Sequence, residues 1–144
     1  MSEAHVRPAT MADLAASWEC DAYAHSSAQR KSYIERAIRQ QQCLLAEVAN
    51  QVAGFAVLNH EFFEQGFISL VVVSSRFRRR GIGLLLLRNA EAVCRTSKVF
   101  SSTNASNQLA QALFNRAGFS RSGVVENLDP ADPEYIYFKE VRRT

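Results

Sequence analysis

The residues best suited to chemistry lie in one stretch, 71–84, which reads VVVSSRFRRRGIGL. A run of β-branched residues leads into a basic turn, and Gly81 and Gly83 then open a segment of helical composition. The first turn of a helix leaves backbone N–H groups without intrahelical partners, at the positive end of the helix dipole. Glycines let an anion approach that backbone closely. The turn adds three arginines that can bond phosphate oxygens: Arg78, Arg79 and Arg80. The pattern predicts a phosphate site.

The residues after the glycines restrict the kind of phosphate ligand. A Walker loop ends in Gly-Lys-Ser/Thr, whereas Gly83 is followed by Leu84 and Leu85. A dinucleotide fingerprint requires a third glycine, and position 86 is leucine. These differences exclude the common nucleoside triphosphate loop and disfavour a Rossmann dinucleotide site.

Two motifs in order resemble one known family. The pattern Arg-x-x-Gly-x-Gly at 78–83, directly after a strand, resembles the coenzyme A pyrophosphate loop of the GNAT superfamily N-acetyltransferases. Downstream, NQLAQALFNRAGF at 107–119 resembles the Asn-x-x-Ala-x-x-Leu-Tyr-x-x-x-Gly-Phe block of the same family. The resemblance is strong from about Gly66 to Phe119 and unspecific outside that range. It implies acetyl-CoA as the acetyl donor and the family's acyl-CoA N-acyltransferase fold.

The resemblance also implies binding roles for particular positions. The strand residues Val71, Val72 and Val73 would bond the pantetheine arm and the acetyl group through their backbone. The pyrophosphate would lie against seven consecutive residues: Arg78, Arg79, Arg80, Gly81, Ile82, Gly83 and Leu84. Three residues of the second block would contact the arm: Asn107, Ala110 and Phe114. The sheet would open between 71–73 and 99–103 to admit the thioester.

Acetyl transfer from a thioester to an amine sets three chemical requirements. A lysine-like amine has a pKa of about 10.4, so a base or a water chain must take its proton. The thioester oxygen gains negative charge, which the backbone N–H near Val73 can stabilise. For the base we name three residues that precede the central strand: His60, Glu61 and Glu64. The departing sulfur benefits from an acid, but Phe114 replaces the family's tyrosine, so water or direct thiolate release is expected to serve.

Three functions remain open from the residues alone. The first is an N-acetyltransferase that acetylates a primary amine of a small molecule or a peptide. The second is a catalytically silent acyl-CoA sensor or partner module, which Phe114 keeps open because it lacks a hydroxyl group. The third is a small nucleic-acid-binding domain built on Arg76–Arg80, although such domains usually carry a larger basic excess.

The elements that must position these residues follow from periodicity and capping signals. We expect an edge strand at 5–9, a helix capped by Thr10 that runs to about Ala24, and a second helix at 29–41. A hairpin at 44–58 and a buried central strand at 67–73 follow. The remaining elements are a helix to about 95, a strand at 99–103, a helix at 108–117 ended by Gly118, and a strand at 135–141. This order predicts an α+β, three-layer domain with a mixed sheet and helices on both faces.

Composition fits one globular domain over residues 1–144. The chain is 47% apolar and carries a formal net charge of +3, which is too small to identify a partner. Arginines concentrate between 76 and 95, and acids between 126 and 134, so one region invites an anion and the other a cation. Three cysteines with no CxxC pair predict no disulfide framework and no metal site, as in a reducing cytoplasm. We expect no membrane or nucleic-acid partner, and the resemblance leaves a homodimer open.

Overall fold

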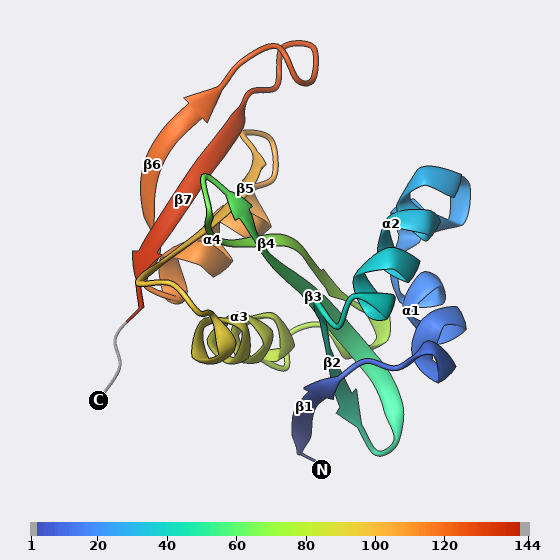
Figure 1. Cartoon of the computed structure of the whole chain (residues 1–144). Helices are drawn as coiled ribbons and strands as arrows, with labels where there is room; N and C mark the ends of the chain where they lie inside the picture. Colours follow the sequence, from blue (N-terminus) through green and yellow to red (C-terminus); the bar gives the residue numbers. More distant parts are fainter. Residues whose placement is uncertain (1–2, 142–144) are drawn as a thin grey trace.

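The computed structural model describes residues 3–141, in which seven strands form one sheet between two layers of helices (Figure 1). The strands are β1 (Ala4–Pro8), β2 (Cys43–Val48), β3 (Gln51–Phe62), β4 (Gln65–Val73), β5 (Lys98–Asn104), β6 (Ser120–Val125) and β7 (Glu134–Glu140). Their order in the sheet is β1-β2-β3-β4-β5-β7-β6. Only the β4–β5 pair is parallel; the other neighbours are antiparallel.

Helices cover both faces of the sheet, and each face has its own apolar core beneath two of the helices. They are α1 (Leu14–Cys20), α2 (Ala28–Arg39), α3 (Ile82–Val93) and α4 (Gln108–Arg116). Under α1 and α2, Ile34 packs with Phe55 and Val57. Under α3 and α4, Leu86 and Phe114 belong to the second core. Strand side chains alternate between these cores because successive residues of a strand point to opposite faces. The expected α+β fold with a mixed sheet and two helical layers is confirmed.

The sheet opens between its two parallel strands. β4 and β5 pair only from Gly66–Val99 to Ile68–Ser101, although β4 continues to Val73 and β5 to Asn104. On its other side β4 stays paired with β3 as far as Val73. The last five residues of β4 therefore keep one edge without a neighbouring strand, and they are half-buried rather than buried.

The first helix is shorter than the sequence predicts. It ends at Cys20 because Asp21 has an extended backbone, and its carboxylate accepts a hydrogen bond from the N–H of Tyr23. Aspartate side chains compete in this way with helical hydrogen bonding. A short 3₁₀ helix, Ala22–Ser26, follows, so the prediction of one helix to Ala24 was wrong.

Two strand assignments also differ from the sequence prediction. β3 extends to Phe62 instead of ending at residue 58. β6 was not predicted, because the segment SRSGVV has no apolar alternation and is exposed throughout. It forms an edge strand that pairs only with β7, with a register shift beside Gly123.

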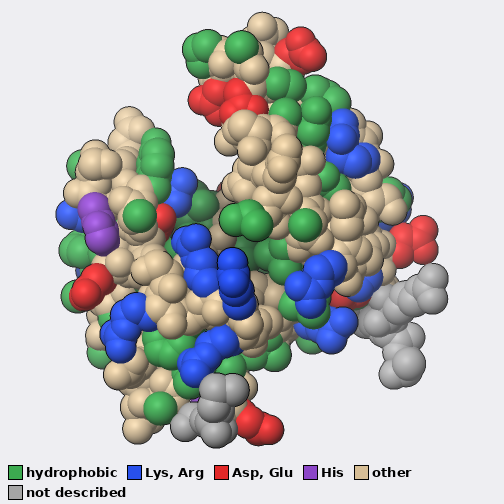
Figure 2. Space-filling model, turned by 180° about the vertical axis from the view of Figure 1, so that it is seen from behind, with side chains coloured by type: hydrophobic (Ala, Val, Ile, Leu, Met, Phe, Trp, Pro, Cys, Tyr) green, Lys and Arg blue, Asp and Glu red, His purple; other side chains and the backbone are tan. Residues whose placement is uncertain are grey.

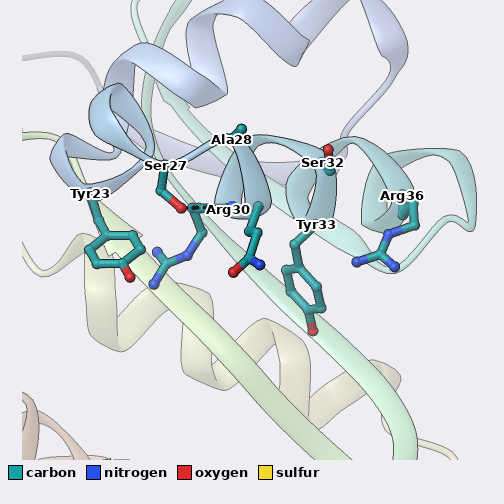
Figure 3. Close-up of a pocket in the computed structure, with 8 residues that line it drawn as sticks. Tyr23, Ser27, Ala28, Arg30, Ser32, Tyr33 and Arg36 are labelled. Atoms are coloured by element: carbon teal, nitrogen blue, oxygen red, sulfur yellow. Dashed lines mark hydrogen bonds between the residues drawn. The ribbon is translucent and has the colours of Figure 1, made fainter. Parts of the chain in front are cut away.

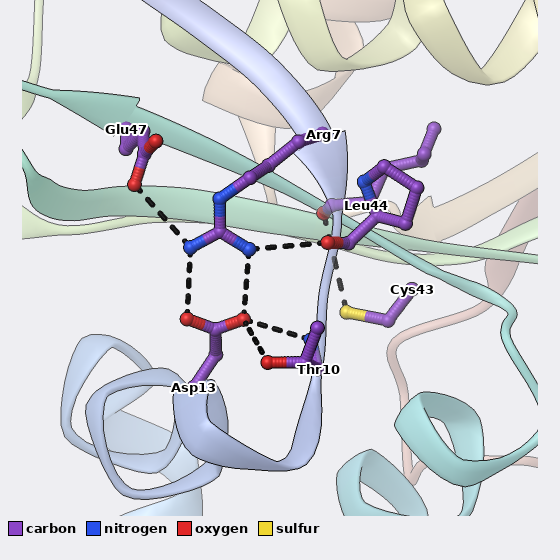
Figure 4. Close-up of polar contacts among 7 residues, drawn as sticks. Arg7, Thr10, Asp13, Cys43, Leu44 and Glu47 are labelled. Atoms are coloured by element: carbon purple, nitrogen blue, oxygen red, sulfur yellow. Dashed lines mark hydrogen bonds and ion pairs between the residues drawn. The ribbon is translucent and has the colours of Figure 1, made fainter.

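An ion-pair cluster joins the first strand to the helix that follows it (Figure 4). Arg7 donates to both oxygens of Asp13 at 2.9 Å and to Glu47 at 3.3 Å. The backbone N–H of Thr10 also donates to Asp13, at 2.7 Å. These hydrogen bonds, first of all those from Arg7, lower the pKa of Asp13 from its ordinary value to about 2.

We expect Asp13→Asn to lower the free energy of unfolding by about 1–3 kcal/mol at neutral pH. The hydrogen bonds from Arg7 then lose their negatively charged partner. A carboxylate with a lowered folded-state pKa stabilises fully above its unfolded pKa and loses that contribution as the pH falls. The difference between the two proteins should therefore shrink between about pH 4 and pH 2. Urea unfolding across that range measures it.

The matched control is Glu35→Gln, which removes only the exposed pair between Glu35 and Arg39 on α2. It should cost at most about 0.5 kcal/mol. Equal losses for Asp13→Asn and Glu35→Gln would contradict the role assigned to the cluster.

Candidate active site

A cleft of about 500 Å³ lies where β4 and β5 separate. Its walls are the end of α1 with the following turn, the open half of β4, the facing part of β5 and the start of α4. Figure 2 shows the hollow between two raised parts of the surface, with a group of Lys and Arg side chains beside it. The cleft thus has the location that the two sequence motifs predict for an extended ligand with an anionic end.

The open edge of β4 presents backbone groups that no strand satisfies. The N–H of Ser74 donates to the carbonyl of Ala53 on β3, at 2.8 Å. Because successive N–H groups of a strand point in opposite directions, the N–H of Val73 and that of Val71 point away from β3, into the opening. The N–H of Val72 points to β3 instead. An amide-containing chain in the cleft could pair with the first two groups as an added strand does.

The helix after β4 begins beside the cleft: a Cβ atom at Gly83 would lie 3.7 Å from Val73, which lines it, although residues 79–84 are not among the lining residues. Gly81 is the N-cap residue with a left-handed backbone (φ 74°), and the first intrahelical bond runs from Leu85 N–H to its carbonyl. The N–H groups of Ile82, Gly83 and Leu84 therefore have no partner within the helix. Unpaired amides at the positive end of a helix dipole are an arrangement that can bind phosphate.

The two glycines serve different purposes. Glycine is favoured at position 81 by the left-handed backbone and not by lack of space, because a Cβ atom there would meet nothing within 4 Å. At Gly83 a Cβ atom would lie 2.9 Å from a methyl group of Leu113. Gly83 thus lets α3 pack closely on α4, a role that the sequence alone did not separate from phosphate approach.

The three predicted arginines have different surroundings. Arg78 lines the cleft. Arg80 lies over the ring of Phe77, with its guanidinium carbon 5.4 Å from the centroid. Arg79 has a left-handed backbone, with φ of 63°. Of the three predicted arginines, Arg78 is therefore the one that lines the opening.

The start of α4 forms the opposite wall. Asn107 caps the helix by accepting a hydrogen bond from the N–H of Ala110 at 3.0 Å, and both residues line the cleft. Phe114 also lines it, with its ring 4.9 Å from that of Tyr137. Asn107 is thus a helix cap and a wall residue at once.

The acids predicted as candidates for the base lie elsewhere. Because β3 extends to Phe62, Glu61 belongs to this strand and Glu64 to the turn that leads into β4; both are exposed and neither lines the cleft. His60 accepts a hydrogen bond from the N–H of Arg95 at 3.0 Å. Burial, with the charge of Arg95, lowers the pKa of His60. The structure does not bring these residues together with Val73.

Other reactive groups also line the cleft, and of these the sequence predicted only the acidic segment that contains Glu134, as a region that attracts a cation. Cys20 lines it, but burial raises the pKa of its thiol to about 11, so the thiol stays neutral and is a poor nucleophile. Ser102 on β5 and Glu134 on β7 also line it, and the serine hydroxyl donates to the carboxylate at 2.7 Å. The sequence signal for Glu134 was its membership of the acidic segment before the last strand.

A shallower hollow of about 650 Å³ lies beside α2 (Figure 3). The side chains of Tyr23, Arg30 and Tyr33 extend from the helices into it. Arg30 lines both hollows and pairs with Asp21 at 2.7 Å. The hydroxyl of Tyr33 is hydrogen-bonded to Ser69 in the cleft. The two hollows therefore adjoin at the open half of β4.

Residues 3–141 contain no group of three or more His, Cys, Asp or Glu side chains arranged to hold a metal ion. None of the helices in this part of the chain has both the length and the apolar character needed to cross a membrane.

Known proteins are similar to this chain in sequence and in fold. The chain is 32% identical over 90 residues to N-alpha-acetyltransferase 30 from Xenopus laevis, a match that covers 56% of this chain and 32% of that protein. The chain thus spans about a third of that relative's length. An acetyltransferase of the GNAT family from Bacillus cereus is 38% identical, with a TM-score of 0.92 over 98% of this chain and 99% of that one. Ard1 from Thermoplasma volcanium has a TM-score of 0.85 at 20% identity, over 97% and 99% of the two chains.

The model of one protein family matches residues 10–119, a range that includes the opened strands, the phosphate loop and α4. That match and the near full-length similarity to the Bacillus cereus structure agree with the geometry of the cleft. The chain belongs to the acetyltransferase (GNAT) family.

Proposed function

We propose that this protein transfers the acetyl group of acetyl-CoA to a primary amine of a small molecule or a peptide. One observation carries the proposal: the unpaired edge of β4 lies in a cleft, and α3, whose first amides have no partner within the helix, begins directly beside that cleft. That combination fits a ligand with an amide-containing arm and a pyrophosphate, which are the two binding features of acetyl-CoA. The family membership supports the same donor.

The donor is bound mainly by the backbone in this proposal. The pyrophosphate lies at the N–H groups of residues 82–84, with Arg78 beside it as a charged hydrogen-bond donor. The pantetheine arm pairs with the backbone of Val71 in the opening, and the N–H of Val73 is left for the acetyl group. Asn107, Ala110 and Phe114 form the opposite wall, where the amide nitrogen of Asn107 has no hydrogen-bond partner within residues 3–141.

The transfer itself needs a neutral amine, a stabilised thioester oxygen and a departing thiolate. The N–H of Val73 is the donor that we assign to the oxygen, because its charge grows during attack. Attack is direct, since the Cys20 thiol is neutral and is not suited to carry the acetyl group. Phe114 is buried against Phe119 and Tyr137 and offers no proton, so the thiolate leaves directly or with water.

The buried phenylalanine also favours one second candidate, a protein that binds acetyl-CoA without turning it over. The family's tyrosine would supply an acid at this position; Phe114 has no hydroxyl, and the tyrosine packed against it, Tyr137, is buried and does not line the cleft. The two candidates share the donor site and differ only in the second half of the reaction. They can therefore be separated by turnover.

The test combines coenzyme binding with turnover. Acetyl-CoA at a hundred times its dissociation constant should stabilise the protein by about 2.7 kcal/mol, measured by denaturant unfolding, with ATP as the control polyanion. Thiol release should then appear with at least one amine of a panel that includes L-phenylalaninamide, Nα-acetyl-lysinamide and spermidine. Stabilisation without thiol release would favour the silent binder. The absence of stabilisation would contradict both candidates.

A further inference from the structure

We propose that Glu134 binds the ammonium group of the acceptor and takes its proton before attack, with Ser102 as the positioning residue. The inference rests on the proposed acetyl transfer, and it assigns the acceptor end of the same cleft. The acceptor class is a primary amine that arrives as a cation.

The first support is the place of the two residues relative to the opening. Ser101 is the last residue of β5 that pairs with β4, so Ser102 stands at the point where the strands separate. β7 lies next to β5, and Glu134 is its first residue, paired in register with Asn104. The hydroxyl of Ser102 holds one carboxylate oxygen of Glu134 at 2.7 Å. The carboxylate is thus fixed in the cleft that also contains Val73, to which the thioester oxygen is assigned.

The second support is the sheet face on which they lie. Tyr135 and Tyr137 pack with the core under α3 and α4. Because strand residues alternate, Glu134 points to the opposite face, which is the side of α1 and α2. Ser102 also points to the side of α1 and α2. It lies three residues after Val99 in β5, and Val99 belongs to the core under α3 and α4, so the two side chains point to opposite faces. Phe114 on α4 and the carboxylate therefore lie on opposite sides of the opening, which leaves the carboxylate side for the acceptor.

The third support is the partners of the other acids nearby. Asp21 lines the cleft, but its carboxylate pairs with Arg30 and accepts from the N–H of Tyr23. In the loop between β6 and β7, Asp129 accepts from Asn104, and Asp132 accepts from Ser106 at 2.6 Å. These two aspartates hold the loop to the β5–α4 connection.

Glu134 has no cationic partner within residues 3–141, and neither have Asp129 and Asp132, but of these three acids only Glu134 lines the cleft. It is half-buried and lines the cleft. Glu19, the remaining acid of the lining, is exposed. A half-buried carboxylate without a countercharge favours the binding of a cation. The cation replaces the contacts with water that the carboxylate has partly lost through burial.

The proton balance of the step is closed. The ammonium group gives one proton to the carboxylate of Glu134, and the free electron pair of nitrogen forms the new bond to the thioester carbon. The carbon–sulfur bond breaks with its electrons on sulfur. The second nitrogen proton goes to the thiolate, directly or through water, and Glu134 returns its proton to solvent. The products are the acetamide, free coenzyme A and one proton.

Glu134→Gln tests the assignment, with Glu126→Gln as the matched control because Glu126 is an exposed acid of the same β6–β7 region and does not line the cleft. The first readout is binding of L-phenylalaninamide and of Nα-acetyl-lysinamide to the protein loaded with coenzyme A, which cannot react. Calorimetric titration should show amine affinity reduced at least about tenfold in Glu134→Gln and unchanged in Glu126→Gln. Stabilisation by acetyl-CoA should be the same in all three proteins.

The second readout is turnover. kcat/KM for the better amine should fall at least about tenfold in Glu134→Gln, and Glu134→Asp should restore part of the loss. Ser102→Ala should mainly raise KM, because it frees the carboxylate without removing it. Equal amine affinity in Glu134→Gln and Glu126→Gln, or no amine binding to the wild-type protein loaded with coenzyme A, would overturn the inference. Amine binding that depends on Glu134 without turnover would support Glu134 as the ammonium-binding residue and contradict both its role as base and the proposed enzyme.

Discussion

Replacement of Val73 by proline is expected to lower kcat by about 10²–10³-fold in a protein that still folds. Proline removes the backbone N–H that we assign to the thioester oxygen. That N–H points into the opening and takes no part in the ladder between β3 and β4. Proline is tolerated in strands at such positions, and Val72 before it already has the extended backbone that proline requires.

Val73→Ala is the matched control, because it shortens the same side chain and keeps the N–H. It should change kcat less than about tenfold, and its free energy of unfolding should fall by about 0.5–2 kcal/mol. Steady-state kinetics and urea unfolding of both variants make the comparison. Equal kcat values for Val73→Pro and Val73→Ala would show that this amide does not act on the reacting oxygen.

The sequence predicted the elements around the phosphate loop well because their signals are local. A β-branched run, two glycines and a helical apolar face occur within about two dozen residues, and each has one physical interpretation. The resulting strand and helix appear at 65–73 and 82–93 in the structure. The same logic gave the second motif, whose helix begins at Gln108 after the cap residue Asn107.

The opening of the sheet could not be derived in that way. The run up to Val73 reads as a central strand buried on both sides, and periodicity does not state where pairing with a neighbour stops. The structure shows pairing with β5 ending at Ile68, so the following residues stay half-buried. The cleft is defined by how β3, β4 and β5 pair with one another, and that pairing depends on contacts between residues distant in sequence.

The acceptor side was predicted only in part: the acidic segment 126–134 was expected to attract a cation, but Glu134 was not named as the base. Glu61 and Glu64 were preferred because they precede the central strand, yet the longer β3 places them at the hairpin end of the sheet. Glu134 came to the opening through β7, which pairs with β5 across about 30 residues of chain. A spatial neighbour of this kind leaves no spacing pattern in one sequence.

The phosphate end of the cleft gives the second large prediction, a comparison of Gly81→Asp with Gly81→Asn. Both residues tolerate the left-handed backbone at this position, and the added Cβ atom would meet nothing within 4 Å. The two variants therefore have similar strain and nearly equal side-chain size. They differ by one negative charge at the cap of α3, next to the amides assigned to the pyrophosphate.

We expect acetyl-CoA to bind Gly81→Asp about a hundredfold more weakly than Gly81→Asn, a difference of about 3 kcal/mol. The reason is repulsion between the aspartate and the pyrophosphate at close range, which added salt should weaken. Gly83 is unsuitable for this comparison because a side chain there would press on Leu113 and disturb the packing of α3 on α4. Calorimetric titration at two ionic strengths provides the measurement. Equal affinities at low salt would place the pyrophosphate away from this helix start, and binding of the donor through the α3 amides would then be excluded.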